Sequence, residues 1–200
     1  MPPLDLLGVT ILKGLLDRPA QEAMVTALRH VAEAAPPVSP DTPYGRKMSV
    51  RMTSAGRFGW HSDRTGYRYL ATRPGGGPWP PIPAEALSLW TQTTDLARPP
   101  DCCLINFYGE GARMGLHQDR DEADFSWPVV SLSLGDDGLF RVGGSTRGGS
   151  TRSVWLQSGD VVILAGPSRL AYHGVDRIRF GSSDLLPKGG RINVTLRVVT

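Results

Sequence analysis

Cysteine is scarce in this sequence, and its placement excludes several classes of site. The chain has two cysteines, and these are adjacent, Cys102 and Cys103. Neighbouring side chains of a strand point to opposite faces, so a disulfide between the two is not expected. A CxxC pair is also lacking, which excludes the common zinc and dithiol motifs.

Long apolar runs are missing as well. The longest, such as VVILAG at 161–166, are too short to cross a bilayer. The first residues, MPPLDLLGVT, place no basic region ahead of an apolar core, so a secretory signal is not expected. Our expectation is a cytoplasmic monomer with no membrane partner. The 200 residues, 40% hydrophobic and 20% charged, predict one domain spanning 1–200.

Acidic residues are nearly absent from one stretch. Between Arg46 and Arg73 there are seven Lys and Arg residues and a single acid, Asp63. Phe, Trp and Tyr residues are interleaved with these cations. Arginine next to aromatics suits a surface that contacts phosphates and stacks on bases. A solvated sheet edge with a few core aromatics would have the same composition, so the residues alone leave both interpretations open.

The first half of the chain predicts helices among a few strands. VTILKGLL at 9–16 predicts a strand, and residues 19–35 predict a helix that begins at a proline and ends before a Pro-Pro pair. A strand-like stretch follows at 44–70, and RPGGGPWPPIP at 73–83 predicts a loop. Residues 83–97 predict a second helix.

From residue 101 onward the pattern is almost entirely strand and turn. Short apolar runs such as CLINFY, WPVVSLSL and RINVTLR alternate with Gly, Asp and Ser turns. GGSTRGGSTR at 143–152 predicts a hairpin loop. We therefore expect an α+β fold, with a sandwich or jelly-roll core backed by the N-terminal helices.

The stretch LHQDRDE at 116–122 contains the most distinctive spacing. Residues two apart in a strand face the same side, so His117 and Asp119 can point to one place. A second imidazole would complete a two-histidine, one-carboxylate set, which suits non-haem Fe(II). His173 follows a buried-looking strand and is a candidate for it. A second HxD pair, His61 and Asp63, lies in a glycine-flanked hairpin and ranks lower, because metal ligands belong on rigid elements. A solvated acidic loop is the simpler alternative.

The last strand has a polar face. RINVTLR places Arg191, Asn193, Thr195 and Arg197 on one side and aliphatic residues on the other. A strand with one face in water would have the same pattern. Two arginines flanking an amide and a hydroxyl would also bind a dicarboxylate through paired hydrogen bonds.

Together these motifs resemble the AlkB family of Fe(II)- and 2-oxoglutarate-dependent dioxygenases. The resemblance rests on HQDRDE, the SRLAYHG histidine, RINVTLR, MSVRMTSAGRFGW, GYRY, PWPPIP, CLINFYGEGARMGLHQD and VVSLSLG, and it covers about 44–197. It implies a double-stranded β-helix (jelly-roll) fold with a nucleotide-recognition lid at 44–73. It also implies Fe(II), 2-oxoglutarate and O2 as cofactors and cosubstrates.

The resemblance assigns residues to three sets. The implied iron ligands are His117, Asp119 and His173. The implied 2-oxoglutarate contacts are Asn106, Tyr108, Arg191, Asn193, Thr195 and Arg197. The implied substrate contacts are Met52, Trp60, Tyr67, Arg68, Tyr69, Asp121 and Arg147. Among these, Trp60 would stack on a flipped base opposite His173, and Asp121 would meet the base edge. Phe107 departs from the family's usual basic residue, but it should face away from Asn106 and Tyr108.

The implied activity is oxidative dealkylation of damaged bases. The substrates would be N-alkylated bases such as 1-methyladenine and 3-methylcytosine in alkylated DNA, single- or double-stranded, or in RNA, with release of formaldehyde. One alternative is a dioxygenase of the same fold that acts on RNA, a protein or a small molecule. The other is a non-catalytic cupin-like protein that only binds metal or ligand.

Overall fold

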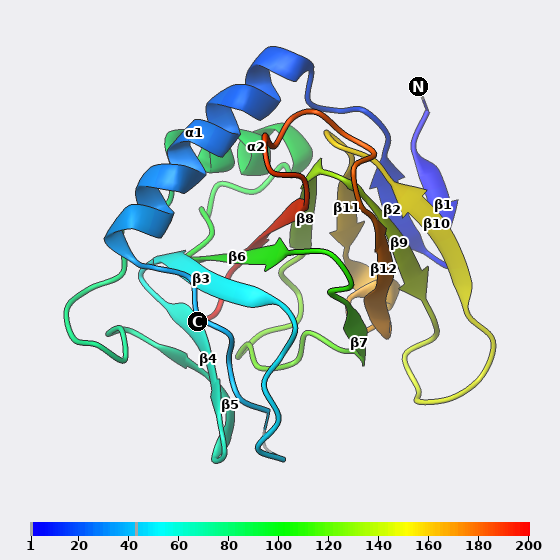
Figure 1. Ribbon diagram of the computed structural model, residues 1–200. Helices are drawn as coiled ribbons and strands as arrows, with labels where there is room; N and C mark the ends of the chain where they lie inside the picture. The colour runs from blue at the N-terminus through cyan, green and yellow to red at the C-terminus, as the bar shows by residue number, and fades with distance from the viewer. Residues whose placement is uncertain (1, 43) are drawn as a thin grey trace.

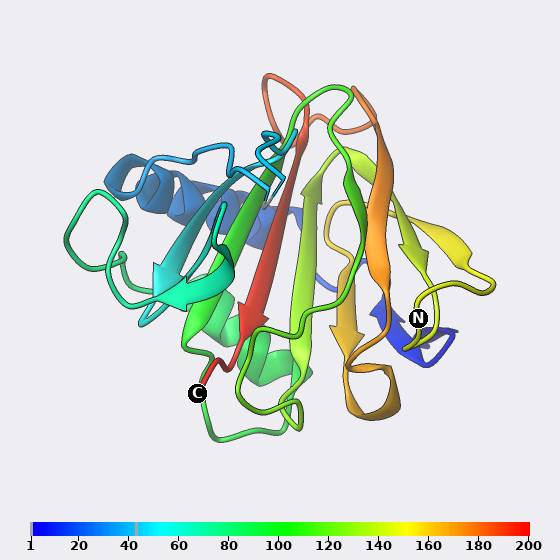
Figure 2. The same ribbon diagram turned by 90° about the horizontal axis from the view of Figure 1, so that it is seen from below.

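The computed structural model describes residues 2–42 and 44–200. Two antiparallel sheets face each other, and two α-helices lie on the outer side of the larger one (Figures 1 and 2). The described residues are thus mostly β with two α-helices, which is less helical than the α+β expectation. None of their helices is long and apolar enough to cross a membrane.

The larger sheet has seven strands in the order β1-β2-β11-β8-β13-β6-β3. Their bounds are β1 Leu4–Leu6, β2 Val9–Leu12, β11 Val161–Leu164, β8 Val129–Gly135, β13 Arg191–Arg197, β6 Cys102–Tyr108 and β3 Arg51–Gly56. The smaller sheet has the order β10-β9-β12-β7, with β10 Arg152–Leu156, β9 Asp137–Val142, β12 His173–Arg179 and β7 Met114–His117. A two-stranded hairpin of β4 (Gly59–Asp63) and β5 (Gly66–Leu70) projects beside them (Figure 1).

The helices form where the sequence predicted them, with one shorter end. Helix α1 spans Arg18–Ala34, and Asp17 caps it by accepting a hydrogen bond from the Ala20 N–H. Helix α2 spans Ala84–Thr93, four residues shorter at its end than the predicted 83–97. The hydroxyls of Thr93 and Thr94 donate to carbonyls of the preceding turn, which competes with helix continuation.

Other boundaries differ for local reasons. The predicted strand 9–16 ends at Leu12, because Lys13 pairs with buried Asp160 and Gly14 adopts a positive φ of 58°. The predicted loop at 116–122 begins inside a strand, since β7 runs to His117. The GGSTRGGSTR segment forms the β9–β10 hairpin loop, as predicted, except that its last residue, Arg152, already belongs to β10. The two cysteines form no disulfide, as predicted, and both are buried.

Two apolar layers hold the sheets and helices together. One lies between the helices and the large sheet, where Met24 and Leu28 of α1 and Trp90 of α2 meet Val194 of β13. The other lies between the two sheets, where residues such as Val162 of the large sheet face Phe140 of the small one. In β13 the aliphatic residues face the helices, and the alternating polar residues therefore face the space between the sheets. That space contains the site.

Candidate active site

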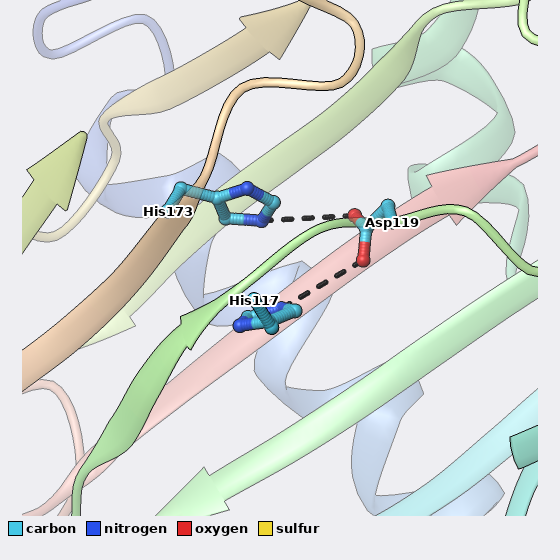
Figure 3. A group of neighbouring side chains, drawn as sticks. All are labelled: His117, Asp119 and His173. Carbon is cyan, nitrogen blue, oxygen red and sulfur yellow. Dashed lines mark ion pairs between the residues drawn. The ribbon is translucent and has the colours of Figure 1, made fainter. Parts of the chain in front are cut away.

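Three predicted ligands meet at one end of the space between the sheets. His117 is the last residue of β7 and His173 is the first of β12; the two strands pair antiparallel with these residues opposite each other. Asp119 follows two residues after β7. One potential ligand atom from each of the three lies within 4.8 Å of the others (Figure 3). Strand pairing thus unites residues that are far apart in the sequence.

Both histidines present Nε2 to Asp119. The Nδ1 atoms of His117 and His173 lie 3.0 Å from the carbonyl oxygens of Gly115 and Ala171. A carbonyl only accepts, so Nδ1 carries the hydrogen in each ring, and the Nε2 lone pair of a neutral ring is free. The Nε2 atoms of His117 and His173 lie 3.7 Å from Oδ1 and Oδ2 of Asp119, respectively. This arrangement is that of metal ligands.

The electrostatics keep Asp119 ionised and His173 neutral. Burial opposes ionisation of Asp119, but Arg197 and the two histidines hold the pKa of its carboxyl well below the usual range. Burial, helped by His117, lowers the pKa of His173 to about 4. Oδ2 of Asp119 is buried without a hydrogen-bond partner. A neutral imidazole pair beside an unsatisfied carboxylate oxygen fits a divalent cation.

The second HxD pair does not form such a group. His61 Nε2 lies 3.2 Å from Asp63 Oδ2 in the β4–β5 hairpin, and Arg68 pairs with the same carboxylate at 2.6 Å. Among the described residues, the three-ligand group is the one formed by His117, Asp119 and His173. The ranking of the two HxD pairs from sequence is therefore confirmed.

At the far end of the same cavity, Arg191 is a buried cation without an acid. It is 1% exposed, and its guanidinium donates to Ser133 Oγ at 2.6 Å and to the Asp136 carbonyl at 3.4 Å. Its Nε has no partner. Burial lowers the pKa of Arg191; Tyr108, Asp160 and Asp137 offset this only in part, and among the described residues no carboxylate forms an ion pair with it. The polar face of β13 is buried. The sequence left open whether this face is solvent-exposed or binds a ligand, and the solvent-exposed alternative is wrong.

Arg197, at the other end of β13, has a different environment. It donates to Asp119 Oδ1 and to the Tyr69 hydroxyl, each at 2.7 Å, and its Nε lies 3.5 Å from Glu122 Oε1. Burial disfavours its charge, but Asp119, Tyr69 and Glu122 raise the pKa of Arg197 well above its usual value. The two arginines that the sequence could not distinguish are thus distinguished by their partners.

The remaining predicted cosubstrate residues line the cavity between the arginines. Asn106 Nδ2 donates to Asn193 Oδ1 at 3.4 Å, and Oδ1 of Asn106 is buried without a partner. Burial raises the pKa of Tyr108 to about 12, so its hydroxyl is neutral and able to donate. Thr195 donates to Asn193 Oδ1. Phe107 packs against the helix-side core, away from its neighbours, as predicted.

Aromatic residues of the hairpin line the same cavity. Trp60 and Tyr67 stack with ring centroids 5.4 Å apart and an interplanar angle of 23°. Trp60 Nε1 donates to Asp121 Oδ2 at 3.2 Å. These three residues and Met52 share the cavity with the histidine–aspartate group. A stacking ring with a fixed orientation and a free carboxylate oxygen therefore lie beside the metal-ligand group.

Three of the predicted substrate residues lie elsewhere. The Tyr69 hydroxyl points inward, donating to Glu122 at 2.6 Å and accepting from Arg197. Arg68 lies along the hairpin and pairs with Asp63. Arg147 is exposed in the β9–β10 loop and does not line the cavity. Of these three, Tyr69 differs most from the predicted substrate contact, because its hydroxyl lies in a buried polar network.

Fewer cations of the basic stretch at 46–73 are available to bind phosphates than its composition suggested. Arg51 and Arg73 donate to the carbonyls of Pro37 and Ala34, and Arg68 and Lys47 pair with aspartates. Within the described residues this leaves Arg46, Arg57 and Arg64 without an anionic or carbonyl partner, and Arg57 lies over the Phe58 ring. Intramolecular contacts therefore account for more than half of the predicted cationic surface.

Sequence reasoning missed two buried residues beside the ligands. Arg169 donates to the carbonyls of Asp119 and Trp127, and it pairs with Glu122 at 3.1 Å. The side chain of Glu122 is fully buried. The only available signal was the density of acids in HQDRDE, of which Glu122 is the last.

Comparisons with known proteins agree with this geometry. The model of the 2OG-Fe(II) oxygenase superfamily matches residues 8–197. The chain is 56% identical over 191 residues to the alpha-ketoglutarate-dependent dioxygenase AlkB homolog of Caulobacter vibrioides, covering 95% of this chain and 87% of that protein. It is 39% identical over 183 residues to alpha-ketoglutarate-dependent dioxygenase AlkB of Escherichia coli K12, covering 89% and 84% of the two chains.

The solved structures agree as well. The structure of OsALKBH1 superposes with a TM-score of 0.79 at 32% identity, covering 98% of this chain and 100% of that one. A prolyl-4-hydroxylase from Pseudomonas putida superposes with a TM-score of 0.55 at 15% identity, a likeness of fold alone.

Proposed function

Since the chain belongs to the 2OG-Fe(II) oxygenase superfamily and, within it, to the AlkB homologues, we propose that it oxidatively dealkylates N-alkylated nucleic-acid bases. It is a Fe(II)- and 2-oxoglutarate-dependent dioxygenase with the double-stranded β-helix fold of these enzymes, and His117, Asp119 and His173 form its facial triad. The alternative of a non-catalytic binding protein is therefore wrong. The proposed substrates are bases such as 1-methyladenine and 3-methylcytosine in alkylated DNA.

One observation carries the proposal. A single cavity is lined by the triad, by buried Arg191 and by Trp60 with Asp121. A cation and the triad suit a cosubstrate that is both a chelator and an anion. An aromatic face beside a carboxylate suits a planar ring that carries an N–H donor. The two halves of the cavity thus match a dicarboxylate and a base.

The residues of the chain position these molecules. Arg191 would hold the distal carboxylate of 2-oxoglutarate, with Asn106, Tyr108, Asn193 and Thr195 filling the space towards the metal. Because Arg197 is already charge-compensated by Asp119 and Glu122, its part in binding the cosubstrate would be smaller than that of Arg191.

The hairpin residues act on the base. Trp60 would stack on a base that has left the duplex, since a metal centre between two sheets cannot reach a stacked one. The hydrogen bond from Trp60 to Asp121 fixes the ring and leaves the second carboxylate oxygen to accept from an exocyclic amine. Loaded with Fe(II), 2-oxoglutarate and O2, the site would supply the oxidation that hydroxylates an N-methyl group, after which formaldehyde leaves the restored base.

Formaldehyde release tests this function. The wild type is assayed with matched DNA and RNA oligonucleotides carrying 1-methyladenine, 3-methylcytosine or no lesion. We expect formaldehyde, with equimolar succinate, only from methylated strands. Trp60→Ala should lower turnover by about 5- to 150-fold, the equivalent of about 1–3 kcal/mol of stacking, and leave metal and 2-oxoglutarate binding intact. Succinate without formaldehyde from every oligonucleotide would refute demethylation of these bases.

A further inference from the structure

Behind the triad lies a closed group of four buried charges. Asp119 and Glu122 supply two carboxylates, and Arg169 and Arg197 supply two guanidinium groups, all with side chains no more than 6% exposed. Arg197 contacts both acids, and Arg169 contacts Glu122 and the backbone of Asp119. The charges cancel, which is how buried charges are tolerated.

Glu122 is the acid of this group that lines no part of the cavity. Its carboxylate lies between the two arginines, 3.1 Å from Arg169 Nη2 and 3.5 Å from Arg197 Nε, and it accepts a hydrogen bond from Tyr69 at 2.6 Å. It does not line the cavity, whereas Asp119 and Arg197 do. A fully buried acid without access to substrate or metal acts through the groups that it holds.

The same group connects the hairpin with the triad. Tyr69 belongs to β5, and its hydroxyl links Glu122 and Arg197 by hydrogen bonds of 2.6 and 2.7 Å. Arg197 in turn donates to Oδ1 of Asp119, which leaves Oδ2 of Asp119 as the oxygen without a partner. A continuous path of short polar contacts therefore runs from the strand that carries Tyr67 to the metal-binding carboxylate.

We propose that Glu122 and Tyr69 are positioning residues that set the orientation of Asp119 and the charge balance behind it, and that couple the β4–β5 hairpin to the metal centre. Glu122 offsets one guanidinium charge, so that no excess positive charge behind Asp119 repels the bound cation. Tyr69 transmits the position of β5 to Arg197. Outer groups of this kind typically change metal affinity by about 10- to 100-fold. The coupling does not depend on which substrate the enzyme oxidises.

The first experiment measures the affinity of the apoprotein for Mn²⁺, a probe that needs no turnover, by electron paramagnetic resonance of the free ion. Glu122→Gln keeps the shape but leaves Asp119 alone with two guanidinium groups. Tyr69→Phe removes one hydroxyl from an otherwise unchanged ring. We expect Mn²⁺ affinity to fall about tenfold or more in Glu122→Gln and by at least threefold in Tyr69→Phe.

Asp160→Asn is the matched control. Asp160 is a buried acid paired with the partly buried Lys13 at the opposite, β11 side of the large sheet, so its replacement also removes a buried carboxylate from a cation. It should lower thermal stability without changing Mn²⁺ affinity. A fall in Mn²⁺ affinity of similar size in Asp160→Asn, or a fall below threefold in the folded Glu122 and Tyr69 variants, would overturn the proposal. If Glu122→Gln does not fold, Tyr69→Phe decides by the same threshold.

Hydrogen exchange tests the coupling itself. Linkage requires that, if the hairpin strengthens metal binding, metal binding stabilises the hairpin by the same factor. We expect Mn²⁺ to slow amide exchange in residues 59–70 of the wild type and to have no such effect in Tyr69→Phe. Equal slowing in both proteins would show that Tyr69 does not carry the coupling.

Discussion

Replacing Arg191 by methionine should have opposite effects on the free protein and on its 2-oxoglutarate complex. The methionine keeps an unbranched stem of similar length and removes the charge. In the free protein that charge is 1% exposed and lacks an acid, and burial lowers its pKa. Replacing an uncompensated buried charge by an apolar side chain is neutral or stabilising. We therefore expect the free energy of unfolding of the metal-loaded, cosubstrate-free protein to stay equal or to rise by up to about 2 kcal/mol.

The complex should be weakened by a predictable amount. Losing a charge-assisted contact costs about 1.5–3 kcal/mol, or roughly a 10- to 100-fold rise in Kd. At a 2-oxoglutarate concentration of about 100 times the wild-type Kd, the ligand stabilises the wild type by about 2.7 kcal/mol. The variant would gain about 0.4–1.4 kcal/mol at the same concentration. For a chain of this size each kcal/mol shifts Tm by about 2–4 °C. The ligand-induced shift should thus fall from about 5–11 °C to about 1–6 °C.

Thermal unfolding with Mn²⁺ present, with and without 2-oxoglutarate, measures both effects. Arg169→Met is the contrasting variant, because Arg169 is equally buried but is paired with Glu122. It should destabilise the free protein by about 3–5 kcal/mol, since it leaves the group of buried charges with one uncompensated negative charge. If Arg191→Met destabilises the free protein as much as Arg169→Met and keeps the full 2-oxoglutarate shift, then Arg191 is a structural cation and not the anion site.

Three further predictions follow from the same contacts. The pKa of His173 is depressed from 6.5 to about 4, so the unfolded chain binds more protons than the folded one between these two pH values. The metal-free protein should therefore lose about 3 kcal/mol of stability as pH falls from 6.5 to 4. Urea titrations across this range should show the loss, and a His173→Asn variant should lack most of it. Asp119→Ala should abolish Mn²⁺ binding and formaldehyde release, whereas Asp63→Ala, in the other HxD pair, should keep both. Arg64→Gln should weaken oligonucleotide binding and reduce the slope of log affinity against log salt by about 0.7–0.9, whereas Arg29→Gln, on the helix behind the large sheet, should change neither.

The sequence predicted those parts of the site that follow from local periodicity. The two-residue period of β13 places Arg191 and Arg197 on one face and aliphatic residues on the other, and the structure confirms both faces. The ligand types of the triad were also predicted, through the spacing of His117 and Asp119 and the family resemblance. Periodicity does not show whether the polar face of a strand is buried or solvent-exposed, because the RINVTLR pattern is the same in both cases.

The partners of the buried charges could not be predicted, because they depend on contacts between distant segments. Tyr69 stands next to Arg68 in a strand whose alternate residues face opposite sides, and the sequence offered no reason to direct its hydroxyl inward. Its partner Glu122 is 53 residues further along the chain, and Arg169 is 47 residues beyond Glu122. Helix α2 also ended early through hydroxyl contacts that propensity does not report.

The charges of the folded site identify the cosubstrate better than the motif does. Asp119, Glu122, Arg169 and Arg197 cancel, so Arg191, Asp121 and a bound divalent cation leave the cavity with two uncompensated positive charges. A dicarboxylate cancels this excess, whereas a monocarboxylate leaves one positive charge and no partner for Arg191. The wild type should therefore bind 2-oxoglutarate about 10- to 100-fold more tightly than 2-oxopentanoate, in which a methyl group replaces the distal carboxylate. Arg191→Met should bind the two acids about equally, because the position that distinguished them is then apolar. Calorimetric titration of both ligands into both Mn²⁺-loaded proteins completes a double-mutant cycle. An unchanged preference in Arg191→Met would mean that another cation receives the distal carboxylate, and Arg197 would be the residue to replace next.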